Sequence, residues 1–278
     1  MKQPITVIIT CLNDTQRLAD CADRCLKLAD EILVAESVEH SGAHEVARRD
    51  ERIRVVHHEP IRRDDFLNWT ISQANHRWVL LLDADEQISQ ALIDEIELVL
   101  SRGATHDAYA INRDTFVNGK RLEAPNASGS RRIRLFRTDQ VLCVQNGARK
   151  TIEIQSGNVG KLSNRIHRSP DWRFELAIEG LTSDAATNAQ QWFDQGKRTS
   201  SIKMLVSPLY HFAIQYLWQG SIFDGIEGVR ISWQTAFQQF CTHAFLRDLT
   251  QASQSQHENE TVDPRTIDLL DPTFRRAA

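Results

Sequence analysis

Three carboxylates within four residues form the part of this sequence best suited to chemistry: Asp83, Asp85 and Glu86 in the segment Asp-Ala-Asp-Glu. Like charges at this spacing repel one another unless a positive charge lies between them. Carboxylate oxygens are ligands of hard divalent cations, and such a cation could bridge to a diphosphate and stabilise a departing nucleotide. The alternative is structural: the acids precede a helix capped by Ser89 and interact favourably with its dipole.

The acidic segment follows the most apolar run of the chain, within an alternation of strand-like and helix-like segments. Apolar and β-branched runs predict buried strands at residues 5–10, 32–35, 53–56 and 78–82. Apolar residues at helical spacing predict helices that begin at Asp14 or Thr15 and that cover residues 45–49, 68–75 and 90–100. Short connections between such elements favour an α/β fold with a mostly parallel sheet.

Ligands of a parallel sheet bind beyond the carboxyl ends of its strands. Three polar segments are predicted at this edge: Thr10–Asp14, Glu36–Ser37 and Asp83–Glu86. We therefore expect the acidic cluster to share one ligand site with the ends of the first two strands.

The pattern changes after residue 105. Strand-like segments at residues 109–111, 116–117, 133–136 and 151–154, with an Asn118-Gly119 turn, predict an antiparallel region. Helical periodicity returns near Asp184, and the chain becomes polar from Thr250. The expected organisation is an α/β domain over residues 1–183, a helical region over 184–249 and a mobile polar tail over 250–278.

Residues 204–223 contain no charged side chain. Arranged as a helix, residues 210–219 place His211, Gln215 and Gln219 on one narrow polar stripe, and Pro208 suits a first helical turn. Such a helix either belongs to the core or lies in a membrane interface with its aromatic face in the bilayer. A second amphipathic helix from Ile226 to Ala244 could pack against it.

The run from Trp78 to Glu86 resembles the metal-binding aspartate motif of family 2 glycosyltransferases with the GT-A fold. More narrowly, the chain is similar to the lipopolysaccharide-core glucosyltransferases of the KdtX/WaaE type over residues 4–248. The supporting segments are Ile5–Thr10, Ala29–Val34, Asn68, Arg134–Arg137, Val159–Leu162, Ser207–Tyr210 and Phe223–Gly228. The resemblance therefore implies a GT-A Rossmann-like sheet, with C-terminal amphipathic helices, in a protein of lipopolysaccharide biosynthesis.

The resemblance also implies a reaction and its site. An inverting enzyme of this kind moves a hexose from a nucleotide-sugar donor to a glycan or glycolipid acceptor, with Mg2+ or Mn2+ as cofactor. Asp85 would be the principal metal ligand, with Asp83 as a second ligand on the ribose side. Thr10, Glu36 and Asn68 would complete the nucleotide-sugar site.

Several positions depart from the family pattern. Glu36 replaces the usual Asp at the end of the second strand, and Gly129-Ser130 stand where Pro-Asp is frequent. The family's His-Glu pair falls on Arg149-Lys150, and neither of these cations is a general base at neutral pH without a large pKa depression of the lysine. The catalytic base is therefore unassigned, and the alternative is a degenerate member that binds nucleotide sugar or glycan without transfer.

Other candidates for a base lie nearby. Side chains alternate along a strand, so Glu153 points away from the Lys150 side and is not a simple replacement. Asp64 and Asp65 are the alternatives from another segment. Arg131, Arg132, Arg134 and Arg137 are either exposed charges or a patch that meets a diphosphate or an anionic acceptor.

Composition narrows the class of protein. A net charge of -4 gives no basic excess, which argues against a nucleic-acid partner. The start of the chain has no signal-peptide pattern. Cys21 and Cys25 are predicted to lie on one face of a helix. They are either apolar core residues or a pair that binds a metal or acts in redox chemistry. We expect a cytoplasmic protein, and the membrane-interface interpretation places it on the inner face of the cell membrane.

Overall fold

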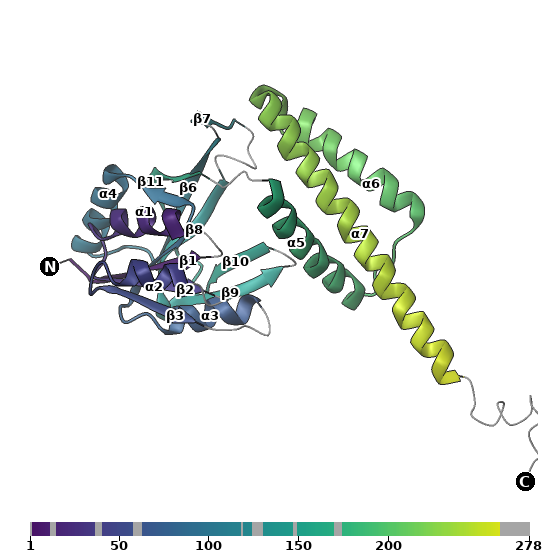
Figure 1. Cartoon of the computed structure of the whole chain (residues 1–278). Coiled ribbons are helices and arrows are strands. Elements are labelled where there is room, and N and C mark those ends of the chain that lie inside the picture. The colour runs from purple at the N-terminus through teal and green to yellow at the C-terminus, as the bar shows by residue number, and fades with distance from the viewer. Residues whose placement is uncertain are drawn as a thin grey trace, which may run out of the picture.

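The structure is a computed structural model that describes residues 2–11, 15–36, 41–57, 63–117, 119–123, 130–146, 149–169 and 174–261. An α/β body contains the first part of the chain, and three long helices follow it (Figure 1). The predicted fold class, a mostly parallel α/β sheet with an antiparallel region and C-terminal helices, is confirmed.

The central sheet begins with four parallel strands in the order β3 (Ile53–His57), β2 (Glu31–Glu36), β1 (Ile5–Cys11) and β4 (Trp78–Asp83). Beyond β4, β8 (Ser130–Arg137) runs antiparallel to both of its neighbours, β4 and β6 (Ala108–Val117). β6 is parallel to β11 (Val159–Arg168), which pairs with the short β5 (Glu86–Ile88). β7 (Lys120–Arg121) turns back on β6.

Both faces of the sheet are buried, which explains why its first strands are apolar runs rather than alternating ones. Helices α1 (Thr15–Cys25), α2 (Ser41–Ala47) and α4 (Gln90–Ser101) contribute to the core on one face. Helix α3 (Arg63–Ser72) covers the other face, together with the antiparallel pair β9 (Val141–Asn146) and β10 (Arg149–Ile154). Within β1, Val7 and Ile9 belong to the first core and Ile8 to the second.

The C-terminal helices are α5 (Phe174–Asp194), α6 (Ser201–Ala213) and α7 (Ile226–Thr261), and α7 packs against the other two. A π-helical turn, η2 (Ile214–Trp218), and a 3-10 turn, η3 (Ser221–Asp224), join α6 to α7 as the tip of a helical hairpin. Figure 1 shows this layer beside the α/β body, with α5 between the body and the hairpin.

The structure corrects three details of the helical prediction. Helix α5 begins at Phe174 rather than near Asp184, so one helix crosses residue 183, and the domain boundaries stay a prediction. Pro208 lies inside α6, because Ser200 caps this helix a full two turns earlier. Residues 250–261 continue α7, since their Gln, Ala, Ser and Glu residues are compatible with a helix.

Candidate functional site

The ends of β1 and β4 bring two of the expected site residues together. Thr10 and Asp83 are direct neighbours in the parallel register, and the Thr10 hydroxyl donates to Asp83 Oδ1 at 2.8 Å. The backbone N–H of Ala84 donates to the Thr10 carbonyl at 3.0 Å. Asp83 is still half-exposed, with 44% of its side chain accessible. The first strand therefore positions the acidic segment, as the strand pattern predicts.

Glu86 is the buried member of the acidic segment. It begins β5 and its side chain is fully buried, and its Oε2 accepts the backbone N–H of Asp83 at 3.1 Å. Helix α4 begins only at Gln90, where the Ser89 side chain accepts from the N–H of Leu92. The structural alternative of helix N-terminal acids is therefore wrong for Glu86, whereas the predicted cap at Ser89 is confirmed.

Three arginines from three different strands neutralise the acids. Arg134 of β8 donates to Glu86 Oε1 at 2.6 Å and to Asp83 Oδ2 at 3.2 Å. Arg113 of β6 donates to Glu86 Oε1 at 3.4 Å, and Arg168 of β11 donates to Asp85 Oδ2 at 2.7 Å. We call these six residues the carboxylate–arginine cluster. Sequence reasoning did not find Arg113 or Arg168, because no local spacing links them to the acids.

A β-bulge directs Arg134 into this cluster. Along β8, Leu135 pairs with Tyr109 and Ile133 pairs with Ala110, so Arg134 is an extra residue without a partner in the register. As a result, Leu135 packs in the first core and Ile133 against the second, although they are two residues apart. Bulges re-aim side chains in this way next to functional sites. Of the two alternatives for the four arginines of this segment, exposed charges or one patch, neither describes Arg134, because it is buried in the cluster.

The other three arginines of residues 131–137 are not part of the carboxylate–arginine cluster. Arg137 pairs with Asp107 at 2.7 Å and with Asp139 at 2.8 Å. Arg131 and Arg132 are exposed on β8. Although the Arg132 residue as a whole is exposed, partial burial of its guanidinium group and the nearby charges of Arg113 and Arg134 lower the pKa of Arg132 to about 10. Arg132 therefore remains cationic at neutral pH in an already basic environment.

The pKa shifts follow from burial and from the paired charges. Burial raises the pKa of Glu86 above its usual range, and Arg134 opposes this effect. Burial alone would lower the pKa of Arg134, but Glu86 and Asp83 raise it above its ordinary value. Asp85 and Asp83 likewise raise the pKa of Arg168 against the effect of burial. The arginines therefore stay charged in the buried cluster.

Asp85 has the one feature of the cluster that fits a metal ion. Its Oδ1 atom is buried and has no hydrogen-bond partner among the described residues, while Oδ2 accepts from Arg168. Within the described part of the chain, no group of three His, Cys, Asp or Glu residues could hold a metal by itself. Mg2+ commonly uses one or two carboxylates and completes its shell with phosphate and water. Asp85 and Asp83 fit that mode of binding, but not an all-protein cage.

The remaining candidates for the nucleotide site, Glu36 and Asn68, differ in how deeply they are buried. Glu36 ends β2 opposite Cys11 in the register, at the same edge as Thr10, and is buried. Asn68 is half-buried on α3, the helix that follows β3. The roles of both residues stay predictions.

The acceptor-side candidates are only partly described. Arg149 and Lys150 begin β10, but the structure does not describe their side chains. The side chains of Asp64 and Asp65, and the whole of Gly129, also lie outside the described part of the chain. The register between β9 and β10 is regular. Ile152 and Ile154 pack against the second core, whereas Glu153 is exposed. The predicted alternation of faces along this strand is confirmed.

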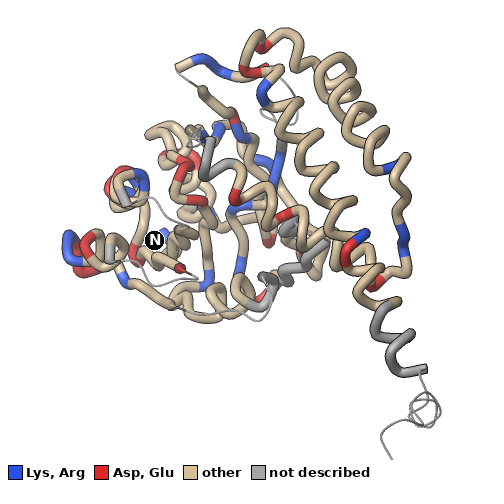
Figure 2. The backbone as a smooth tube through the Cα atoms, turned by 45° about the vertical axis from the view of Figure 1, so that its right-hand side comes forward, with Lys and Arg blue, Asp and Glu red and all other residues tan. Residues whose placement is uncertain are grey.

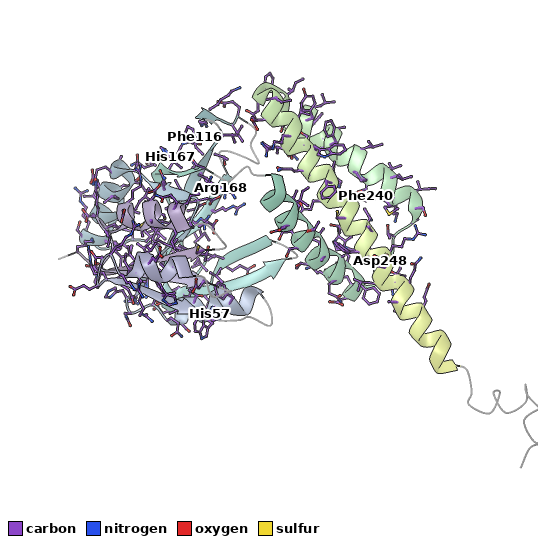
Figure 3. The ribbon with its side chains drawn as sticks, in the orientation of Figure 1. His57, Phe116, His167, Arg168, Phe240 and Asp248 are labelled. Carbon is purple, nitrogen blue, oxygen red and sulfur yellow. The ribbon has the colours of Figure 1, made fainter. Side chains whose placement is uncertain are left out.

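The paired cysteines of the first helix have a structural role. Cys21 and Cys25 are fully buried in the first core, and a hydrogen bond between the two side chains raises the pKa of the Cys21 thiol. This confirms the core interpretation. The adjacent residues His57, His58 and Glu59 are side-chain types that can bind a metal, but neighbours on a strand face opposite sides. Of the three, the structure describes His57, which is exposed at the end of β3 (Figure 3).

An exposed apolar surface extends along the helical hairpin. Leu209 is 72% exposed, Trp218 89%, and Phe223 and Ile226 77% each, whereas the polar Gln215 and Asp224 are buried. On α6 the exposed apolar residues follow helical spacing: Ile202, Leu205, Val206, Leu209, Tyr210 and Ala213. Figure 2 shows few charges on this layer compared with the sheet. The core-helix interpretation is therefore wrong for Leu209 and Trp218.

None of the helices within the described ranges has the length and apolar character needed to cross a membrane. The tip of the hairpin contacts the α/β body, where the buried side chain of Asp224 accepts a hydrogen bond from the backbone N–H of Glu123 at 2.6 Å. Gly225 has a φ of +67° and Gly228 approaches the Ser221 carbonyl closely. These contacts explain the residue types at Asp224, Gly225 and Gly228.

Comparisons with known proteins agree with the chemistry of this edge. The model of the family described as Glycosyl transferase family 2 matches residues 6–150, slightly more than half of the chain. The lipopolysaccharide core biosynthesis glycosyltransferase LpsC of Rhizobium meliloti (strain 1021) is 24% identical over 255 residues, which cover 87% of this chain and 92% of that protein. The uncharacterized glycosyltransferase RP128 of Rickettsia prowazekii (strain Madrid E) is 23% identical, with 92% and 90% covered.

Among solved structures, the mannosyltransferase PcManGT from Pyrobaculum calidifontis, in complex with GDP-Man and Mn2+, has a TM-score of 0.49 and 12% identity, with 88% and 87% of the two chains covered. TarS of S. aureus in complex with UDP-GlcNAc has a TM-score of 0.46 and 12% identity, with 87% and 91% covered. Structural similarity at these TM-scores and identities assigns no ligand to this chain. The description of its fold rests on its own strand order.

Proposed function

Because the chain belongs to glycosyl transferase family 2, we propose that it transfers a hexose, with inversion, from a nucleotide sugar to a glycan or glycolipid acceptor. One observation carries this proposal: Thr10 and Asp83 meet at the carboxyl edge of the parallel strands, and Asp85 follows in the next turn of the chain. Open α/β sheets bind their ligands there. The lipopolysaccharide-core relative favours a glycolipid acceptor.

We propose that the donor diphosphate lies over Asp83 and Asp85. Mg2+ or Mn2+, when bound, would supply positive charge to the diphosphate of the leaving nucleotide. The Oδ1 atom of Asp85, which is buried and accepts no hydrogen bond from any residue that the structure describes, supports its role as principal ligand. Asp83 would hold the metal or the ribose, and Thr10 keeps the Asp83 carboxylate oriented through its hydrogen bond. Glu36 and Asn68 would bind the nucleoside.

Calorimetry tests the donor site. UDP-sugars and GDP-sugars are titrated into the protein with Mn2+ and then with a chelator, and binding is expected only with the cation. Asp85→Asn should weaken binding by at least about tenfold, the range of a lost charge-assisted contact. Asp94→Asn is the matched control, because Asp94 is exposed on α4 and bonds only its neighbour Gln90 among the contacts described. Equal donor binding with and without cation would contradict the metal role.

We further propose that the hairpin surface rests on an anionic bilayer, on the inner face of the cell membrane. The observation that favours this occupant is an uncharged apolar stripe ending in Trp218, the residue type enriched at membrane interfaces. Lys203 at the start of α6 adds a positive charge suited to anionic headgroups. An acceptor held in the membrane would then be available to a site on the attached α/β body.

Liposome flotation tests the membrane proposal. Wild-type protein should float with vesicles that contain phosphatidylglycerol, and Trp218→Glu should reduce the bound fraction. Leu98→Glu is the control, because Leu98 is an exposed apolar residue of α4, away from the hairpin. A wild-type protein that stays in solution, and that forms a dimer disrupted by Trp218→Glu, would assign the surface to a second copy of the chain instead.

A second candidate function is binding of nucleotide sugar without transfer. Arg149 and Lys150 favour it, because they replace the pair from which a general base is expected. Nucleotide release and the anomeric configuration of the product, measured with lipid-linked acceptors, distinguish the two. Normal donor binding without turnover on any acceptor would favour the binding protein.

A further inference from the structure

Arg168 is held directly against the proposed metal ligand. Its Nε donates to Asp85 Oδ2 at 2.7 Å, and the backbone N–H of the next residue, Ser169, donates to the Asp85 carbonyl at 2.9 Å. Figure 3 labels Arg168 at the end of β11, where the chain leaves the sheet toward the helices. The side chain of Asp85 therefore already has a cationic partner in the donor-free protein.

The carboxylate–arginine cluster is balanced in charge without a metal. Asp83, Asp85 and Glu86 contribute three negative charges, and Arg113, Arg134 and Arg168 contribute three positive charges. A divalent cation that entered this cluster alone would meet three guanidinium groups close by. A diphosphate that entered together with the cation would supply the missing negative charge.

Arg168 differs from the other two arginines in its freedom to move. The side chains of Arg113 and Arg134 are 7% and 8% exposed, and both contact the fully buried Glu86. The side chain of Arg168 is 34% exposed, and its described ion pair is with Asp85 alone. Displacing Arg113 or Arg134 would remove one of the two cations that contact the buried Glu86 carboxylate, which is costly. Displacing Arg168 would free only Asp85.

We propose, on the basis of the function proposed above, that Arg168 occupies the Asp85 carboxylate in the donor-free protein and moves to the donor diphosphate when cation and donor bind. Arg168 is then a positioning residue that couples the two ligands. Asp85 Oδ2 becomes available to the cation, next to Oδ1, which has no partner within the described ranges. Guanidinium groups bind diphosphate oxygens well. By linkage, the diphosphate strengthens cation binding by the same factor as the cation strengthens diphosphate binding.

The alternative is that Arg168 only stabilises the turn between β4 and β5, which contains Asp85. In that case its removal would lower stability and weaken every ligand alike. The coupling proposal makes a different prediction. Without a diphosphate, Arg168 competes with the cation for Asp85 and weakens cation binding. With a diphosphate, Arg168 contacts the diphosphate and strengthens the binding of both ligands.

Mn2+ binding to the full-length protein tests this inference without any turnover. The loss of the free Mn2+ signal in electron paramagnetic resonance, and calorimetry, give the Mn2+ affinity without nucleotide and with UDP or GDP. Wild type should bind Mn2+ weakly alone and at least about tenfold more tightly with one diphosphate, within the usual range of coupling between sites. Arg168→Ala should bind Mn2+ alone about tenfold more tightly than wild type, with a smaller gain on adding the diphosphate.

Two further variants complete the experiment. Arg168→Lys should remain close to wild type for Mn2+ alone, because the charge beside Asp85 is kept. Arg165→Ala should behave as wild type, since Arg165 lies on the same strand but pairs with Asp114 at 2.8 Å. Circular dichroism and thermal unfolding confirm that each variant is folded.

The outcomes separate this inference from the proposed function. If wild type binds Mn2+ with a diphosphate, but folded Arg168→Ala gains no affinity for Mn2+ alone, the coupling role of Arg168 is wrong and the metal site stands. If wild type binds no Mn2+ with either diphosphate, the proposed metal dependence fails, and the inference fails with it.

Discussion

Replacing Arg134 by methionine should cost about 3–5 kcal/mol of unfolding free energy, the range for removing one partner of a buried ion pair. Arg134 is nearly fully buried and is the closest cation to Glu86, at 2.6 Å. Glu86 itself has no solvent access, and Arg113 approaches it only to 3.4 Å. Methionine retains much of the volume of the side chain, so the loss is mainly that of the charge and its hydrogen bonds.

The cost should depend on pH. Burial already raises the pKa of Glu86, and Arg134 opposes this rise. Removing Arg134 raises the pKa of folded Glu86 further above its unfolded value of about 4.3. A carboxyl with a raised folded-state pKa stabilises the fold when protonated and loses that contribution as pH rises through its folded pKa. The difference between wild type and Arg134→Met should therefore be smaller at pH 5 than at pH 8.

Thermal and urea unfolding at the two pH values measure this effect. A loss of about 3–5 kcal/mol corresponds to a fall in Tm of about 6–20 °C for a domain of this size. Arg131→Met is the control, because Arg131 is exposed on the same strand and its loss should be worth less than about 0.5 kcal/mol. A double-mutant cycle with Glu86→Gln should give a coupling of about 1–3 kcal/mol. Additive effects, or an Arg134→Met as stable as Arg131→Met, would refute the reasoning.

Three further predictions concern other parts of the molecule. Glu31→Gln should cost about 2 kcal/mol by urea unfolding at pH 7, because hydrogen bonds from Thr6, Asn75 and Arg54 keep the pKa of Glu31 low despite burial. Its folded pKa is depressed, so the advantage of wild type should disappear as pH falls below about 4. Gly228→Ala should lower Tm, with a cost of at least about 2 kcal/mol, because the new Cβ would lie 1.7 Å from the Ser221 carbonyl oxygen; an unchanged Tm would contradict the close approach. Glu153→Gln should leave turnover within about twofold, since this exposed residue faces away from the Ile152 side of β10, and a near-total loss with normal donor binding would overturn the geometric argument.

Local pattern determined much of the fold from the sequence. The strands ending at Cys11, Glu36 and Asp83 are continuous apolar runs because both faces of the parallel sheet are buried. The Ser89 cap and the buried face of α4 also follow from residue types within one or two helical turns. The adjacency of Thr10 and Asp83 follows in turn, because parallel strands end at one edge.

Strands whose pattern is weak were not predictable in this way. β5 has three residues, and β11 is rich in charged and polar residues, with only Gly160, Leu162 and Ile166 buried. A register shift between Lys161 and Arg165 interrupts its alternation. The orientation of the helical hairpin was not predictable either. The spacing of residues 210–219 shows that they have a polar and an apolar side, but it does not show which side packs against the rest of the protein. In the fold, Gln215 hydrogen-bonds Ser221 inside the hairpin, and Trp218 is exposed.

The charges that complete the acidic cluster are the clearest case of what only tertiary structure decides. The sequence alone determines that three carboxylates follow a buried strand and require positive charge nearby. It does not determine that this charge comes from Arg113, Arg134 and Arg168, which lie 27, 48 and 83 residues from their acidic partners. Strand order and one β-bulge bring these side chains together, and the energy of an ion pair depends on distance in space and on burial rather than on separation along the chain.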